Sequence, residues 1–316
     1  MSQLAVRPFG RTGLSVSALG FGAGEIGAAD LDEREIEALL RTAIELGVTL
    51  IDTARSYGLS EERIGRFLGP VRDQIVLSTK VGYGVDGVPD WTGECVRRGI
   101  DRALGLLATD RIDIVHLHSC PVDVLARGDV IAALHDARQA GKIRCAAYSG
   151  DNEALAWAAA SGQFDSLQLS WSVCDQHAAA VIERAHQAGL GVIAKRPLAN
   201  APWRFDDRPA GQEAELYWER WRALVNEERS GVAGEGAAGD ADGARGLDRG
   251  ALAWDELFAR FAAHAPGVSS AIAGTRRIEH LRHNAALVAR GALPEAVVAA
   301  VRARFNAVGA GWPARI

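Results

Sequence analysis

The sequence alternates eight times between short apolar segments and longer amphipathic ones. The short segments have strand length and lie at residues 15–22, 48–52, 74–80, 111–118, 142–149, 166–171, 191–195 and 269–275. Near-continuous β-branched runs such as 48–52 are typical of a parallel sheet that is buried on both faces. Eight strand–helix units in one chain of 316 residues predict a (β/α)8 TIM barrel. We expect one domain over 1–316.

All of these strands except the seventh are followed promptly by a segment with helical periodicity. The expected helices cover 30–46, 60–68, 92–107, 130–140, 153–161, 179–188 and 278–288. The first of them has a clear apolar stripe at Ile36, Leu39, Leu40, Ala43 and Ile44. Asp30 and Asp32 are its candidate N-caps, and Gly47 is its candidate C-cap.

A doubly wound sheet is the alternative to a barrel. Such folds carry a GxGxxG turn after the first strand, and GFGAGEIG at 20–27 contains that spacing loosely. The acidic residue that should follow about 20 residues later is missing, because Asp52 lies about 30 residues on. The glycines therefore favour the doubly wound sheet only weakly.

The seventh strand is followed by a long insertion at 202–250. Its first part predicts a helix around 216–225, and its second part is rich in Gly, Ala and Asp with almost no large apolar residue. Such a composition does not bury enough apolar surface to order the chain. We expect this part to be disordered, or to act as a lid on the barrel.

Composition bears on partners and compartment. The formal net charge is −5 and no long Lys/Arg block is present, so we expect neither nucleic acid nor an anionic membrane as a partner. No apolar run approaches the ~20 residues that span a bilayer, and the first residues lack the apolar core of a signal peptide. The four cysteines are far apart. We expect a cytoplasmic monomer with reduced thiols.

Ionisable side chains stand where the second, third and fourth strands end. Asp52 ends the second strand with Tyr57 in its loop, Lys80 ends the third and His118 the fourth. The carboxyl ends of barrel strands meet on one face, where chemistry takes place. An ammonium stabilises a neighbouring phenolate, and a carboxylate keeps that ammonium charged. This set suits protonation of an alkoxide that forms from a carbonyl group.

His116 and His118 form an HxH pair on one strand, so both rings point the same way. Metal-dependent hydrolases use such pairs, but they need further ligands at other strand ends. The remaining histidines lie mostly in helical stretches. We therefore expect no metal, and we expect His116 to be a hydrogen-bonded core histidine one layer deeper than His118.

The motifs IDTARSYG-x-x-E, LSTKVG, IDIVHLH and GKIR…S follow one another along nearly the whole chain. In this order they resemble the aldo-keto reductase family, and RPFGRTGLSVSALGFG resembles its N-terminal β-hairpin and first strand. The resemblance implies an NADP(H)-dependent barrel that reduces an aldehyde or ketone, or oxidises the alcohol, without a metal. It implies Tyr57 as general acid, tuned by Lys80 and Asp52, with His118 placing the carbonyl.

The resemblance also implies where the nicotinamide end of the cofactor binds. Ser149 and Gln168 match the residues that hold the carboxamide, and the Gly22-Ala23 backbone approaches the nicotinamide. The chain departs from the pattern twice. Gly150 replaces an Asn, so that either Asn152 stands in for it or nothing does, and Lys195 replaces a stacking aromatic residue. Lys195 and Arg196 can instead serve the pyrophosphate, with Pro197 and Leu198 following in the same loop.

GTRRIEHLRHN at 274–284 resembles the adenosine-phosphate site. Thr275 and Arg276, after Gly274, match the 2′-phosphate contacts, and His280 and Asn284 match the adenine pocket. A guanidinium fork suits a phosphate dianion, which favours NADP(H) over NAD. Because the nicotinamide pocket is altered, a second hypothesis is an NADP-binding, weakly catalytic regulatory or interaction subunit on the same barrel.

Overall fold

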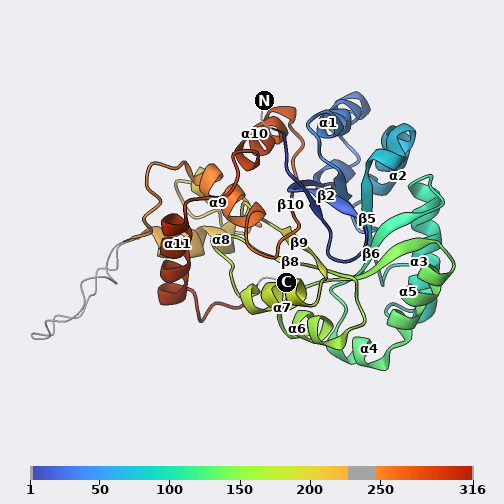
Figure 1. The fold of residues 1–316 in the computed structure, drawn as a ribbon. Helices are drawn as coiled ribbons and strands as arrows, with labels where there is room; N and C mark the ends of the chain where they lie inside the picture. The colour runs from blue at the N-terminus through green and yellow to red at the C-terminus, as the bar shows by residue number, and fades with distance from the viewer. Residues whose placement is uncertain (1–2, 227–245, 315–316) are drawn as a thin grey trace, which may run out of the picture.

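A closed barrel of eight parallel strands forms the centre of the molecule (Figure 1), in a computed structural model that describes residues 3–226 and 246–314. Around the barrel the strand order is β10-β3-β4-β5-β6-β7-β8-β9. These strands are β3 (Leu19–Gly22), β4 (Leu50–Asp52), β5 (Val76–Val81), β6 (Ile112–His118), β7 (Ile143–Ser149), β8 (Ser166–Ser170), β9 (Gly191–Lys195) and β10 (Ser270–Ala273). The predicted barrel is confirmed, and the doubly wound alternative is wrong.

A two-stranded antiparallel sheet precedes the barrel, formed by β1 (Val6–Pro8) and β2 (Ser15–Ser17). The prediction of one continuous strand over 15–22 is wrong, because the chain leaves this sheet at Ala18 before β3 begins. At the break the Ser17 hydroxyl donates to the carbonyl of Leu19 at 2.6 Å and accepts the N–H of Thr49 at 2.9 Å. Fully buried Phe9, between the two hairpin strands, packs so tightly against Gly191 that a Cβ there would lie 2.6 Å from the ring. The hairpin therefore closes the end of the barrel opposite to the strand C-termini.

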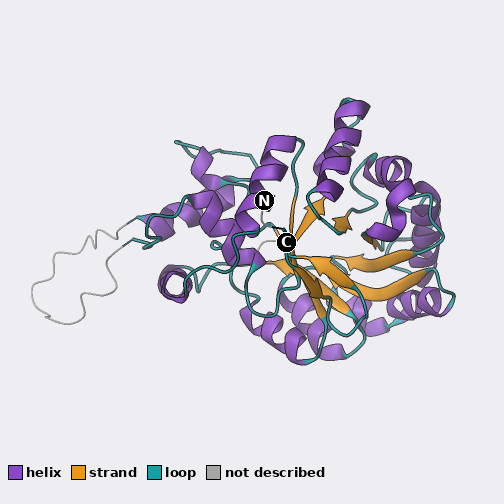
Figure 2. Ribbon diagram, turned by 45° about the horizontal axis from the view of Figure 1, so that its top comes forward, coloured by secondary structure: helices purple, strands orange, loops and turns teal. Residues whose placement is uncertain are grey.

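Helices surround the strands on the outside (Figure 2). They are α1 (Glu33–Glu45), α2 (Ser60–Leu68), α3 (Gly93–Leu106), α4 (Val122–Arg127), α5 (Asp129–Gln139), α6 (Asn152–Ser161), α7 (Ala179–Gln187), α8 (Glu215–Val225), α9 (Trp254–Ala263), α10 (Ile278–Val288) and α11 (Glu295–Val308), with 3₁₀ turns η1 (Glu25–Gly27), η2 (Gly69–Gln74) and η3 (Pro202–Arg204). All seven helices expected from periodicity are present; α4, α9 and α11 are additional. Asp32, and not Asp30, caps α1, since its carboxylate accepts the N–H groups of Arg34 and Glu35.

The insertion after β9 contains the predicted helix, α8. Its last turn is bound by Arg304 of α11, whose guanidinium donates to the carbonyls of Ala223, Leu224 and Asn226 at 2.9, 3.0 and 2.7 Å. These bonds satisfy carbonyls that a helix end leaves without partners. The Gly-rich part of the insertion, for which disorder was predicted, lies in 227–245, outside the described residues.

The four cysteines, Cys95, Cys120, Cys145 and Cys174, are free and buried. Burial raises the pKa of every one of their thiols, to about 12 for Cys120 and Cys145. The thiolate is the reactive form of cysteine, so these groups are poor nucleophiles. Over the two described ranges, the helices are all too short or too polar to cross a lipid bilayer.

Candidate active site

A buried ion pair joins the ends of β4 and β5. Lys80 Nζ lies 2.7 Å from Asp52 Oδ2, and the exposed fractions of the two side chains are 1% and 2%. Burial alone would raise the pKa of Asp52, but Lys80 and further donors outweigh it and hold that pKa below its usual value. Burial alone would lower the pKa of Lys80, but Asp52 and Tyr57 outweigh it and raise that pKa. Both groups are therefore charged at neutral pH.

Tyr57 lies over this ion pair, in the loop between β4 and α2. The ammonium of Lys80 is 4.9 Å from the centroid of the phenol ring. The loop that carries Tyr57 is hydrogen-bonded to η1, because Leu59 N donates to Gly27 O at 2.9 Å. A Cβ on Gly24 would lie 3.7 Å from the Tyr57 ring, so the chain after β3 forms one wall of the space around the phenol.

Asp52 is the centre of a wider hydrogen-bond network. Its Oδ1 accepts the Ser78 hydroxyl at 2.7 Å and the Gln168 amide at 2.9 Å. The hydroxyl of Ser149 in turn donates to Gln168 Oε1 at 2.8 Å. Strands β4, β5, β7 and β8 are therefore linked at their C-terminal ends through one carboxylate.

His116 lies beneath this network and is fully buried. Its Nε2 is 3.1 Å from Ser78 Oγ. Since the Ser78 hydroxyl already donates to Asp52, His116 Nε2 carries the hydrogen in this contact. Burial lowers the pKa of His116 to about 4, so the ring is neutral. The predicted deeper position is confirmed, although Nδ1 makes no hydrogen bond to the described residues.

His118 ends β6 on the same side as the ion pair. Its ring meets the Tyr57 ring edge-on, with centroids 6.1 Å apart. Burial, helped by the charges of Lys80 and Lys195, lowers the pKa of His118 to about 3. The imidazole is therefore neutral at physiological pH and acts as a hydrogen-bonding group rather than as a cation.

These side chains face one cavity of about 270 Å³ at the C-terminal ends of the strands. It is lined by Asp52, Tyr57, His118, Ser119, Ser149, Gln168, Lys195, Arg196 and Ile272. The structure thus brings three predicted catalytic residues and four predicted cofactor residues to one space, with Lys80 directly behind Asp52. Apart from Ile272 the lining is polar or aromatic, which suits a small polar ligand.

A second buried ion pair forms the far side of this cavity. Lys195 Nζ lies 2.8 Å from Asp151 Oδ2, and burial lowers the pKa of Lys195 even though Asp151 opposes this. Asp151 also accepts the backbone N–H and the hydroxyl of Ser170, at 2.8 and 3.1 Å. Arg196 Nη1 donates to that hydroxyl at 3.0 Å. Sequence reasoning gave no role to Asp151, since its partner is 44 residues away in the sequence.

The replacement at Gly150 has a steric cause. A Cβ at this position would lie 2.4 Å from the hydroxyl and 2.8 Å from Cε1 of Tyr148, a buried side chain whose hydroxyl donates to Cys120 O. Asn152 does not fill the place of the missing amide, because its side chain donates to Ala314 O at 3.4 Å and does not line the cavity.

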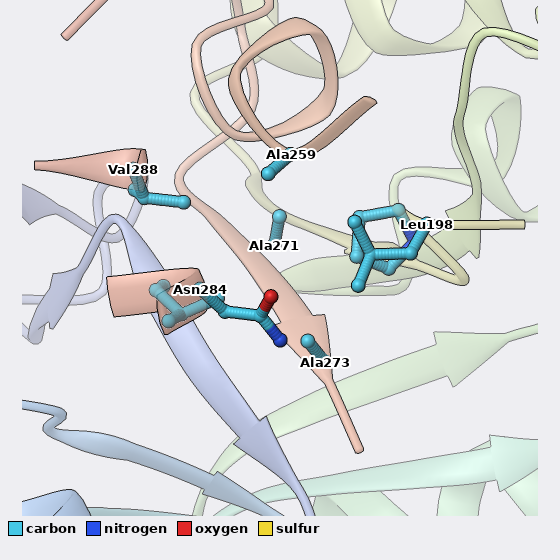
Figure 3. A pocket seen from close by; sticks show the side chains of 8 residues that line it. Leu198, Ala259, Ala271, Ala273, Asn284 and Val288 are labelled. Carbon is cyan, nitrogen blue, oxygen red and sulfur yellow. The ribbon is translucent and has the colours of Figure 1, made fainter. Parts of the chain in front are cut away.

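A second, much smaller hollow of about 10 Å³ lies between β10, α9, α10 and the loop after β9 (Figure 3). It is lined by Leu19, Pro197, Leu198, Ala259, Ala271, Ala273, Asn284 and Val288. Three predicted cofactor residues, Pro197, Leu198 and Asn284, therefore meet here rather than in the large cavity. The Asn284 amide points toward the β10 side of the hollow in Figure 3.

Six further predicted residues line neither space. Gly22 and Gly274 pass each other so closely that a Cβ on Gly274 would lie 3.0 Å from Gly22 O, and Ala23 N donates to Asp52 O. Thr275 accepts the Arg277 N–H at 3.1 Å beside the start of α10. The Arg276 guanidinium is about half exposed and lies 3.5 Å from Glu25. His280 is exposed.

The HxH pair on β6 is a pattern that metal-dependent hydrolases also use. Within residues 3–226 and 246–314, no three His, Cys, Asp or Glu side chains gather in a way that could hold a metal ion. His116 and His118 instead serve two different hydrogen-bond partners, Ser78 and Tyr83.

Comparison with known sequences gives a consistent result. The family model described as Aldo/keto reductase family matches residues 18–233. The L-galactose dehydrogenase of Arabidopsis thaliana is 35% identical over 159 residues, which cover 48% of this chain and 50% of that protein. The D-threo-aldose 1-dehydrogenase of a Pseudomonas species is 30% identical over 249 residues, covering 66% and 75%. The chain thus spans half the length of the plant relative that it matches.

Solved structures show the same architecture. A Pseudomonas aeruginosa structure described as an aldo-keto reductase superposes with a TM-score of 0.67 at 31% identity, covering 92% of this chain and 97% of that one. A Bacillus halodurans aldo-keto reductase in its holo form superposes with a TM-score of 0.73 at 23% identity, covering 96% of both chains. At 23% identity, the second match shows only that the fold is the same.

Proposed function

The chain belongs to the aldo/keto reductase family, and from that premise we propose that it is an NADP(H)-dependent oxidoreductase that reduces an aldehyde or ketone to an alcohol, or catalyses the reverse. One observation carries the proposal. The Lys80 ammonium lies 4.9 Å from the centroid of the Tyr57 ring and 2.7 Å from Asp52, and Asp52, Tyr57 and His118 line one cavity. This arrangement can deliver a proton to a carbonyl oxygen.

Tyr57 is the general acid in this proposal. As the carbonyl carbon is reduced, negative charge develops on the oxygen, and the Tyr57 hydroxyl gives its proton to that oxygen. The phenolate left behind is stabilised by the Lys80 ammonium. Asp52, at 2.7 Å, keeps Lys80 charged and fixed in place. In the oxidative direction the same phenolate accepts the proton of the alcohol.

His118 contributes a hydrogen bond rather than a proton. Because burial lowers its pKa to about 3, the ring is neutral when the carbonyl group binds. A neutral imidazole donor aimed at the carbonyl oxygen stabilises the developing charge and orients the carbonyl group.

The residues at the cofactor positions fit NADP(H) by their chemistry, and the cofactor, when bound, supplies the hydride. Gln168 uses one amide hydrogen on Asp52 and keeps the other, with a carbonyl lone pair, for a carboxamide; Ser149 lies beside it. Gly22 and Gly274 lie against each other, and neither carries a side chain that would cover the backbone there. The exposed Arg276 and the N-terminus of α10 offer positive potential to a 2′-phosphate.

Lys195 and Arg196 would bind the pyrophosphate from the cavity side, with Pro197 and Leu198 in the same loop. Thr275 and Gly274 would approach the 2′-phosphate, and His280 and Asn284 would contact the adenine. We propose a cytoplasmic location, since four buried free thiols fit a reducing compartment, and a monomer as the oligomeric state. Two relatives are named for dehydrogenation of sugars, so aldoses belong in the first substrate panel beside simple aldehydes and ketones.

The test begins with cofactor binding. NADPH and NADH are titrated by tryptophan quenching into the wild type and Arg276→Ala. Preference for NADPH in the wild type, and its loss in the variant, supports the 2′-phosphate site. The carbonyl and sugar panel follows, with Tyr57→Phe as the variant that binds NADPH normally but does not turn over. An active Tyr57→Phe enzyme would exclude Tyr57 as the acid.

One observation favours a second function, an NADP-binding regulatory or interaction subunit with weak catalysis. The far side of the cavity carries the ion pair of Lys195 and Asp151 where the resemblance implies an aromatic surface. Tight NADPH binding with negligible turnover of every carbonyl in the panel supports this function and excludes the reductase.

A further inference from the structure

A second phenol lies at the edge of the cavity, on the chain that leaves β5. The hydroxyl of Tyr83 is 2.8 Å from His118 Nδ1, and the two rings are stacked with centroids 5.6 Å apart and an interplanar angle of 25°. We propose that Tyr83 is a positioning residue, which fixes the tautomer and orientation of His118 so that His118 Nε2–H faces the carbonyl oxygen. This inference rests on the proposed function.

The loop that carries Tyr83 is built to hold this side chain in place. Trp91 packs on its far side, with ring centroids 5.6 Å apart. Trp91 in turn covers Gly82 so closely that a Cβ there would lie 2.3 Å from the indole, and Trp91 N donates to Gly82 O at 2.7 Å. The half-buried Tyr83 ring therefore contacts both Trp91 and His118.

The hydrogen of the Tyr83 phenol has two possible acceptors. His118 Nδ1 lies at 2.8 Å and Ser56 Oγ at 3.2 Å. The neutral imidazole has one nitrogen without a hydrogen, and this nitrogen is a stronger base than a serine hydroxyl. Two arrangements satisfy these contacts: Tyr83 donates to a bare Nδ1, or Nδ1–H donates to Tyr83 while Tyr83 donates to Ser56 Oγ. The proposal takes the first, because the contact to Nδ1 is the shorter of the two.

The tautomer of His118 follows from this bond. A neutral imidazole carries one hydrogen, so with Nδ1 accepting from Tyr83 the hydrogen resides on Nε2. His118 lines the cavity together with Tyr57. A carbonyl oxygen placed there meets two donors, the Tyr57 hydroxyl and His118 Nε2–H. The opposite tautomer would present a lone pair to that oxygen and repel the charge that develops on it.

The chain offers a matched pair of variants. Tyr83→Phe keeps the ring that stacks on His118 and removes only the hydroxyl. Ser56→Ala removes the other contact of that hydroxyl and leaves the bond to His118. Both are prepared with ¹⁵N-labelled histidine, and the His118 resonances are assigned by their loss in His118→Gln. The nitrogen shifts of a neutral ring distinguish the protonated nitrogen from the bare one, with or without bound NADPH.

In the wild type and in Ser56→Ala, we expect Nδ1 to resonate as the bare nitrogen and Nε2 as the protonated one. In Tyr83→Phe we expect a mixture or the reverse tautomer. We also expect kcat on the preferred carbonyl to fall by roughly tenfold, the size of one lost hydrogen bond, with the Kd for NADPH unchanged.

Two results overturn the proposal. One is a His118 tautomer in Tyr83→Phe that equals the wild type, whatever the activity. The other is a changed tautomer with unchanged kcat. If the wild type itself reduces no carbonyl, the proposed function fails. The nitrogen shifts in that case still decide whether Tyr83 sets the tautomer.

Discussion

Gly27 lies against the backbone of Tyr57 so closely that a Cβ on Gly27 would fall 1.7 Å from the Tyr57 carbonyl oxygen. The two residues come from the loops after β3 and β4, and Gly27 O accepts the N–H of Leu59 just beyond Tyr57. The position of the proposed acid therefore depends on the absence of a side chain at a residue 30 positions earlier in the sequence.

We expect Gly27→Ala to displace Tyr57 and lower kcat about a hundredfold, since a shift of about 1 Å in a reacting group costs that much. NADPH binding, measured by fluorescence, should be retained. Gly105→Ala is the matched control, because a Cβ on this exposed glycine in α3 would have no neighbour within 4 Å. It should keep full activity and gain about 0.5–1 kcal/mol of stability. Equal activity in the two variants would contradict the prediction.

Asp52→Asn should destabilise the protein by about 3–5 kcal/mol, because it leaves the Lys80 ammonium buried without a counter-charge. The double variant Asp52→Asn/Lys80→Met removes the orphaned charge and should be more stable than Asp52→Asn alone. Guanidinium unfolding of the three proteins measures the difference. A double variant less stable than the single one would show that the cost lies in lost packing instead.

The free energy of unfolding should fall as the pH is lowered from about 6.5 toward 4. The folded pKa values of His116 and His118 are lowered to about 4 and 3, below the value of about 6.5 in an unfolded chain. In this window the unfolded chain binds protons that the folded protein does not, so acid favours unfolding. Glu61 acts in the opposite direction, since burial raises its pKa.

The measurement is Tm against pH for the wild type and His118→Gln. The variant should lose less Tm between pH 6.5 and 4.5, whatever its Tm at neutral pH. Identical slopes would mean that His118 is protonated in the folded protein at these pH values.

Gly150→Ala should cost about 1–3 kcal/mol, the usual penalty of overpacking, because the new methyl group meets the Tyr148 ring. In Gly150→Ala/Tyr148→Val the obstructing ring is gone. The double variant should therefore be more stable than the sum of the two single effects predicts. Strict additivity, measured by urea unfolding, would place the strain elsewhere.

The barrel could be predicted because eight strand–helix units repeat along the chain. The polar residues at the strand ends could be predicted to lie close together, because the carboxyl ends of parallel strands are on the same face of the barrel. The break between β2 and β3 could not be predicted, since residues 15–22 form one strand-like run in the sequence, whereas β2 pairs with β1 and β3 pairs inside the barrel.

The side-chain contacts between different strand ends could not be predicted from the sequence either. Lys195 stands out in the sequence as an unusual residue, but its partner Asp151 is fixed by the register of β7, β8 and β9 rather than by any local pattern. Tyr83 could not be singled out for the same reason: nothing near it in sequence indicates that it stacks on His118. The additional helices α9 and α11, by contrast, were predictable, because apolar residues recur at helical spacing in both, as at Leu257, Phe258 and Phe261 in α9.

Because all four thiols are buried, the native protein has no reactive cysteine that would interfere with site-directed labelling. With the pKa of each thiol raised and each side chain enclosed, maleimides and spin labels should leave the wild type unmodified. In Val6→Cys, at a position that is 58% exposed on the hairpin, the new thiol alone would carry the probe, and no native cysteine would need to be replaced.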